Sequence, residues 1–166
     1  MIRQGGLHFL QAAFLLKTEK EVIFMEIKYD LSRFAEAHQR DYQTALSEIK
    51  RGRKTSHWMW YIFPQIKGLG ISSMSVYYGI ADAGEARAFL DDPYLGANLR
   101  EICEALYGLE TSDALQVFGS PDDMKLCSSM TLFDYVSGGE IFGRVLNKFF
   151  CGRRDSATLE KLVFEN

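Results

Sequence analysis

Apolar residues recur at three- and four-residue steps in the segment after Asp30, a spacing that is typical of one face of a helix. The positions on this stripe are Leu31, Phe34, His38, Tyr42, Ala45, Leu46 and Ile49. Asp30 is expected to cap the helix and Gly52 to end it. The pattern therefore predicts a first helix between these two residues, with a hydrogen-bonded His38 on its buried face.

Caps, prolines and glycines divide the rest of the chain into further short helices. Asp82 and Glu85 form a variant of the capping box, and Asp155 is expected to cap the last helix. Asp92-Pro93 and Ser120-Pro121 each place a cap before a proline at the first helical position. Further helices are expected over residues 58–63, 73–78, 82–90, 92–107, 112–119, 120–137, 140–150 and 156–163, with Ser73 and Ser112 as caps. Because no alternating pattern is sustained, the sequence predicts an all-α, single compact globule of about seven or eight short helices.

Length and charge narrow the class of protein. The chain of 166 residues is long enough for one domain with a substantial core. Its 19 Lys and Arg against 22 Asp and Glu give a net charge of −3, which argues against a general nucleic-acid binder. Three cysteines, Cys103, Cys127 and Cys151, form no metal-binding or disulfide pattern, so buried, inert thiols and a cytoplasmic location are expected.

The N-terminal segment differs from the rest of the chain. Its apolar run from Leu7 to Leu16 is interrupted by His8 and Gln11 and is too short to span a membrane. We expect residues 1–24 to be an N-terminal extension that is disordered or loosely packed, before a single all-helical domain over residues 25–166. The alternative is an amphipathic helix that lies on a partner or membrane, although its few cations disfavour the membrane.

A basic and aromatic segment is the first candidate for chemistry. Both tryptophans, Trp58 and Trp60, follow a run of cations that includes Arg53 and Lys54. Aromatic planes stack on bases and arginine binds phosphate, so this composition suits a phosphorylated, base-containing small molecule. His57 is the candidate general base, and Gln65 could read an amide or base edge. The alternative is that the cations end a helix and the aromatic rings fill the core.

A second candidate segment begins at Ser120. Lys125, Ser128 and Ser129 would lie within about one stripe of a helix. Serines are poor helix formers, so their place in mid-helix suggests either ligand binding or close helix packing. Asp122 and Asp123 are first-turn carboxylates, which the helix dipole favours with or without a ligand.

At these segments the chain resembles a bacterial family, the domain of unknown function 1810, which automatic annotation sometimes labels calpastatin. The resemblance covers roughly residues 30–163 and implies an all-helical fold, with no established activity or catalytic residues. The strings that carry it are Asp30-Leu31-x-Arg33-Phe34, Gly52-Arg53-Lys54-x-Ser56-His57-Trp58-Met59-Trp60-x-Ile62-Phe63-Pro64-Gln65, Gly119-Ser120-Pro121-Asp122-Asp123-x-Lys125-Leu126, Ser128-Ser129-Met130-Thr131-Leu132-Phe133 and Asp155-x-x-Thr158-Leu159. Nothing in the sequence resembles the calpain-inhibitor repeats.

Two functional hypotheses follow. The alternative to both is that the two segments only fill the core and cap helices. In the first, the protein binds or hydrolyses a nucleotide-derived small molecule such as ADP-ribose or an N-glycoside, without a metal or cofactor. The residues assigned to this site are His57 as base and Arg53, Lys54, Trp58, Trp60, Gln65, Lys125, Ser128 and Ser129 as ligand-binding groups. In the second, the Trp/Arg-rich segment is a protein-interaction surface without catalysis. The sequence leaves the oligomeric state open.

Overall fold

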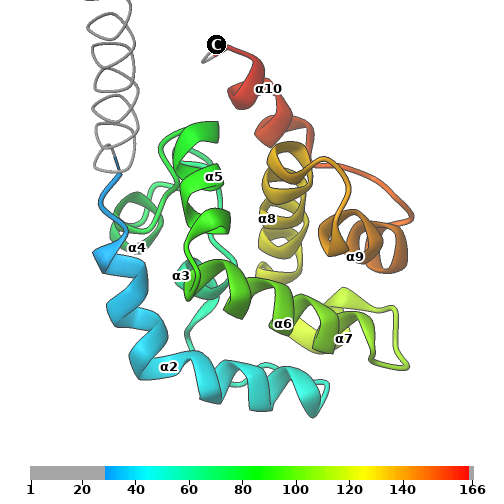
Figure 1. The fold of residues 1–166 in the computed structure, drawn as a ribbon. Helices are drawn as coiled ribbons and strands as arrows, with labels where there is room; N and C mark the ends of the chain where they lie inside the picture. Colours follow the sequence, from blue (N-terminus) through cyan, green and yellow to red (C-terminus); the bar gives the residue numbers. More distant parts are fainter. Residues whose placement is uncertain (1–28, 165–166) are drawn as a thin grey trace, which may run out of the picture. The chain divides into compact units, whose positions relative to one another are not determined.

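Nine helices and one isolated parallel β-bridge make up residues 29–164, the part of the chain that the computed structural model describes (Figure 1). The helices are α2 (Ser32–Lys50), α3 (Met59–Ile62), α4 (Ser73–Tyr77), α5 (Ala83–Asp91), α6 (Leu95–Tyr107), α7 (Ala114–Phe118), α8 (Asp122–Ser137), α9 (Ile141–Phe150) and α10 (Ser156–Phe164). The bridge joins Ile66 and Ile80. The expected all-α fold is confirmed, although the described residues form nine helices instead of the expected seven or eight. The prediction for residues 1–24 lies outside the described residues. None of the described helices is long and apolar enough to cross a membrane.

Two helices carry caps one residue away from the predicted positions. Ser72 rather than Ser73 caps α4, and Asp113 rather than Ser112 caps α7. In both, the side-chain oxygen accepts a hydrogen bond from the backbone N–H three residues later, at 3.1 and 3.2 Å. The residue whose side chain reaches this N–H is the cap. A neighbouring polar residue has the same capping chemistry, so the sequence alone does not distinguish the two.

Three helices begin later than predicted. α2 starts at Ser32 with Leu31 at the capping position, so Asp30 is not its cap. Pro93 and Pro121 each lie before the first helical residue of α6 and α8. Asp92 still supports the start of α6, because its Oδ1 accepts hydrogen bonds from the backbone N–H groups of residues 94 and 95 at 2.9 and 2.8 Å.

The predicted cap of α5 is present and gives a testable contribution to stability. Asp82 Oδ1 accepts a hydrogen bond from Glu85 N–H at 2.9 Å, while the Glu85 carboxylate accepts one from Ala81 N–H at 2.6 Å. We expect Asp82→Ala to lower the free energy of unfolding by about 1 kcal/mol. Asp82→Asn should keep most of this stabilisation, because asparagine also caps helices well. Urea denaturation of the three proteins measures this difference, and equal stability of wild type and Asp82→Ala would contradict it.

Helix α8 lies at the centre of the core and packs against α5, α7, α9 and α10 (Figure 1). All its residues from 126 to 133 are buried, including Ser128, Ser129 and Thr131. A helix surrounded on most sides lacks a polar face, and small side chains let its neighbours approach closely. The Thr131 hydroxyl donates to the Cys127 carbonyl at 2.7 Å, which satisfies it inside the helix.

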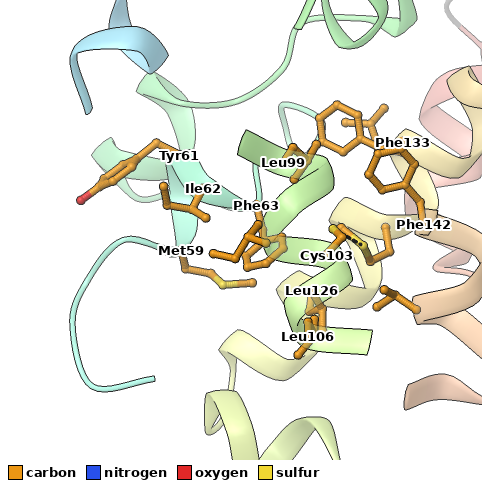
Figure 2. Packing of buried hydrophobic residues seen from close by; sticks show 14 of the residues in the cluster. Met59, Tyr61, Ile62, Phe63, Leu99, Cys103, Leu106, Leu126, Phe133 and Phe142 are labelled. Atoms are coloured by element: carbon orange, nitrogen blue, oxygen red, sulfur yellow. Dashed lines mark hydrogen bonds between the residues drawn. The ribbon is translucent and has the colours of Figure 1, made fainter. Parts of the chain in front are cut away.

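The segment from Trp58 to Phe63 fills the space beside α6 and α8. As predicted, it contains a short buried helix, α3. Figure 2 shows Met59, Ile62 and Phe63 in the packed interior, where their side chains approach those of α6 and α8. This burial fixes the position of the loop on either side, and both loops carry candidate site residues.

The cysteines are not all buried as expected. Cys103 and Cys127 are buried, whereas Cys151 is exposed at the C-terminal end of α9. Burial raises the pKa of both the Cys103 and Cys127 thiols, so these two are poor nucleophiles. Cys151 is in the left-handed region, with φ of 54°, and follows the last turn of the helix, which explains its exposure.

Candidate functional site

An open cleft of about 590 Å³ lies between the N-terminal parts of α8 and α10 and the loop that precedes α4. It brings together four of the residues assigned to the site from the sequence: Trp60, Gln65, Lys125 and Ser128. The first two belong to the aromatic segment and the last two to α8. Two stretches about 60 positions apart in sequence therefore form one hollow.

Trp60 and Lys125 are in direct contact at this cleft. The Lys125 Nζ lies 4.5 Å from the centroid of the half-buried Trp60 ring, within the range of a cation–π interaction. Leu69 and Met124 add apolar surface to the walls, and Met124 is an exposed residue. The cleft thus combines an aromatic, largely apolar wall with one positive charge.

Asp122 is the counter-ion of two lysines. Its Oδ1 lies 2.8 Å from Lys125 Nζ, and its Oδ2 lies 2.7 Å from Lys54 Nζ. Burial raises the pKa of the Asp122 carboxyl, but hydrogen bonds from Lys125 and Lys54 outweigh burial and leave it below its usual range. Because two ammonium groups share one carboxylate, this cluster carries a net positive charge.

The other end of the cleft is polar. Ser128 Oγ lies 3.2 Å from Asp155 Oδ2, and that oxygen also accepts a hydrogen bond from Thr158 N–H at 3.0 Å as the cap of α10. The side-chain amide of Gln65 makes no hydrogen bond with any residue in the range 29–164, so it remains available to a ligand. These groups can donate and accept hydrogen bonds beside the apolar wall.

Two of the assigned residues are buried in the core. Trp58 is only 1% exposed, its ring packs near Phe63 and Phe118, and no ligand can stack on it. Ser129 is fully buried as well, and its Oγ has no hydrogen-bond partner among the described residues. The assignment of Trp58 as a stacking platform is therefore wrong, and the interaction hypothesis keeps only one of its two tryptophans near the surface.

The remaining assigned residues line other cavities. Arg53 and Lys54 lie in a depression of about 540 Å³ beside α7. His57 is exposed and lines a depression of about 280 Å³ together with Asp41 and Tyr61. Since none of the three lines the cleft, the structure separates the predicted base and the predicted phosphate ligands from the residues around Trp60.

Glu48 is the most densely hydrogen-bonded side chain near these loops, and it was not predicted. Its carboxylate accepts from the backbone N–H and hydroxyl groups of both Thr55 and Ser56 at 2.5–3.0 Å, and from Trp58 Nε1 at 2.8 Å. Burial raises the pKa of Glu48, but the hydrogen bonds from Ser56 and Thr55 outweigh it and lower the pKa to about 2. This carboxylate fixes the loop between the basic residues and α3. A glutamate beside the apolar stripe of α2 gives no sequence signal for that role.

No group of three or more His, Cys, Asp or Glu side chains within residues 29–164 is placed to hold a metal ion. Lysine or arginine side chains line the cleft and the depression beside α7, and aromatic side chains line the cleft and the depression at His57.

Comparisons with known proteins place the sequence beside other proteins of unknown function. A family model described as "Protein of unknown function (DUF1810)" matches residues 28–162. The crystal structure of the conserved hypothetical protein Rv1873 from Mycobacterium tuberculosis is similar, with a TM-score of 0.79 and 40% sequence identity over 81% of this chain and 97% of that one. A comparison with curated proteins gave no match.

Proposed function

Because the chain belongs to the DUF1810 family, which offers no activity to transfer, we propose a function from its own residues: binding of a nucleotide-derived small molecule, such as ADP-ribose, in the cleft. The observation that carries this proposal is the convergence of Trp60, Gln65, Lys125 and Ser128 on one cavity. Its volume of about 590 Å³ falls within the usual range for small-molecule sites.

Each wall of the cleft suits one part of such a ligand. A base or sugar ring packs against the apolar wall formed by Trp60, Leu69 and Met124. The Gln65 amide pairs with the polar edge of the base, as an amide can both donate and accept. An anionic group of the ligand approaches Lys125, whose charge Asp122 only partly neutralises because Asp122 also pairs with Lys54.

The proposal is for binding, and the geometry supplies no complete set of groups for hydrolysis of an N-glycosidic bond. Asp155 is the one carboxylate that lines the cleft within the described residues, and it already accepts hydrogen bonds as the cap of α10. His57 lines a different depression. A base at the reacting atom must lie within hydrogen-bond reach of its proton, and neither residue is arranged for that task.

Removing the charge of Lys125 tests the proposal. We expect Lys125→Met to weaken ADP-ribose binding about tenfold, which corresponds to the loss of about 1.4 kcal/mol from a charge-assisted contact. Isothermal titration calorimetry of wild type and variant measures this ratio. Lys50→Met is the matched control, because Lys50 is exposed at the end of α2 and does not line the cleft.

Two results would contradict the proposal. One is the absence of any heat of binding for ADP-ribose at millimolar concentration in the wild-type protein. The other is equal affinity in the Lys125→Met and Lys50→Met variants, because the ligand would then bind elsewhere. A partner-binding role would instead show as recovery of a protein that the Trp60→Ala variant no longer retains.

A further inference from the structure

The depression beside α7 carries the densest positive charge of the cavities described above. Arg51, Arg53 and Lys54 line it on one side and Gln116 on the other, and none of its lining residues is acidic. Both arginines are exposed, and neither forms an ion pair with another residue in the described range. We infer that this basic depression is a second binding site, separate from the cleft, for the phosphate group of a small molecule.

The donors in the depression fit a phosphate group. Guanidinium groups present paired N–H donors that match two phosphate oxygens, and two arginines lie here. The Gln116 Oε1 accepts a hydrogen bond from Thr111 Oγ1 at 2.9 Å, which leaves the amide N–H₂ of Gln116 free to donate. The side chains of Arg51, Arg53 and Gln116 thus all offer hydrogen-bond donors to the depression.

The backbone under these side chains is held in place before any ligand binds. Arg53 N–H donates to the Glu48 carbonyl at 3.1 Å, and Lys54 N–H donates to the Val117 carbonyl at 2.8 Å. The Lys54 side chain is only 8% exposed and is anchored by Asp122. A loop that is fixed on two sides loses little conformational entropy on binding, and this favours affinity.

Helix-end electrostatics do not account for the whole cluster. Lys50 is in the last turn of α2 and Arg51 follows it directly, where the helix dipole favours cations. Arg53 lies beyond that turn, and the dipole effect decays within it. The dipole of α2 therefore does not account for the charge of Arg53. An anion from solution is the partner that suits the exposed position of Arg53.

Asp122 links this site to the cleft. One of its carboxylate oxygens binds Lys54, which lines the depression, and the other binds Lys125, which lines the cleft. Neutralising Asp122 would free both ammonium groups to attract anions. We therefore expect Asp122→Asn to bind inorganic phosphate several-fold more tightly than wild type does, because removal of the negative charge of Asp122 raises the positive electrostatic potential in the depression.

Titration with inorganic phosphate and pyrophosphate at constant ionic strength, followed by ¹H–¹⁵N NMR, tests the inference. Saturable shifts of the Gly52, Gln116 and Gly119 amides are expected. The Arg51→Gln/Arg53→Gln double variant should lose at least about tenfold in affinity, whereas Arg153→Gln, at an exposed arginine after α9, should not. Absent or unsaturable shifts, or equal affinity in the double variant, would overturn the site. Unchanged affinity in Asp122→Asn would overturn the role of Asp122.

This inference and the proposed function can fail separately. The Lys125→Met variant should lose less affinity for inorganic phosphate than the double arginine variant does, because Lys125 does not line the depression, while it loses about tenfold in affinity for ADP-ribose in the cleft. If phosphate binds and ADP-ribose affinity does not depend on Lys125, the proposed function fails and the second site stands. If the double arginine variant leaves phosphate binding intact, the second site fails whatever ADP-ribose does.

Discussion

Replacement of Glu48, a buried carboxylate, by alanine is expected to lower the free energy of unfolding by about 3–5 kcal/mol, because it leaves the buried indole N–H of Trp58 and the part-buried donors of Thr55 and Ser56 without an acceptor. Trp58 Nε1 lies in the core and donates to Glu48 Oε2 at 2.8 Å. The backbone N–H groups of Thr55 and Ser56 donate to the same oxygen at 2.8 and 3.0 Å. Each unsatisfied buried group costs about 1–3 kcal/mol, and a new cavity adds to this loss.

Urea denaturation of matched variants measures the effect. Glu36→Ala is the control, because Glu36 is an exposed glutamate on the same helix, α2. Glu48→Gln should be intermediate, since an amide oxygen at the place of Oε2 can accept from Trp58 Nε1 and the two backbone N–H groups, while the amide N–H₂ faces the Thr55 and Ser56 hydroxyls that donate to Oε1. If Glu48→Ala is no less stable than Glu36→Ala, the carboxylate does not hold the loop.

The helices could be predicted because their signals are local. The stripe from Leu31 to Ile49 and the caps Asp82 and Asp155 each act within a few residues, so sequence neighbours determine them. The observed helix starts and caps differ from the predicted ones by one or two residues. At α4 two neighbouring polar residues, Ser72 and Ser73, could both serve as the cap. The buried serines of α8 follow from packing on all sides, which the periodicity of one helix does not show.

The candidate site could be predicted only in part. Trp58 and Trp60 have the same chemistry and lie two positions apart, yet one is buried in the core and the other borders the cleft. That difference depends on which neighbours α3 meets, and those neighbours come from distant helices. For the same reason the sequence grouped His57 and Arg53 with Trp60, although the folded loop directs them to separate cavities.

A buried histidine gives the fold a second pH-sensitive element besides Glu48. His38 Nε2 lies 2.8 Å from the Tyr61 carbonyl, and its Nδ1 lies 3.2 Å from Asn98 Nδ2. A carbonyl only accepts and an amide N–H₂ only donates, so the neutral ring with its proton on Nε2 satisfies both partners. Burial lowers the pKa of His38 to about 4, against the opposing hydrogen bond to the Tyr61 carbonyl.

Stability is therefore expected to fall by about 3 kcal/mol as the pH drops from about 6.5 to about 4. In this window the unfolded chain, with a histidine pKa of 6.5, binds a proton that the folded protein does not bind, and this favours unfolding. Urea denaturation across this range measures the slope. His38→Gln should flatten it, whereas the exposed-site variant His57→Gln should keep the wild-type slope. Glu48 contributes little in this window, because its pKa is lowered from 4.5 to about 2 and its effect on stability lies mainly at lower pH. If His38→Gln leaves the slope unchanged, a group other than His38 binds the proton on unfolding.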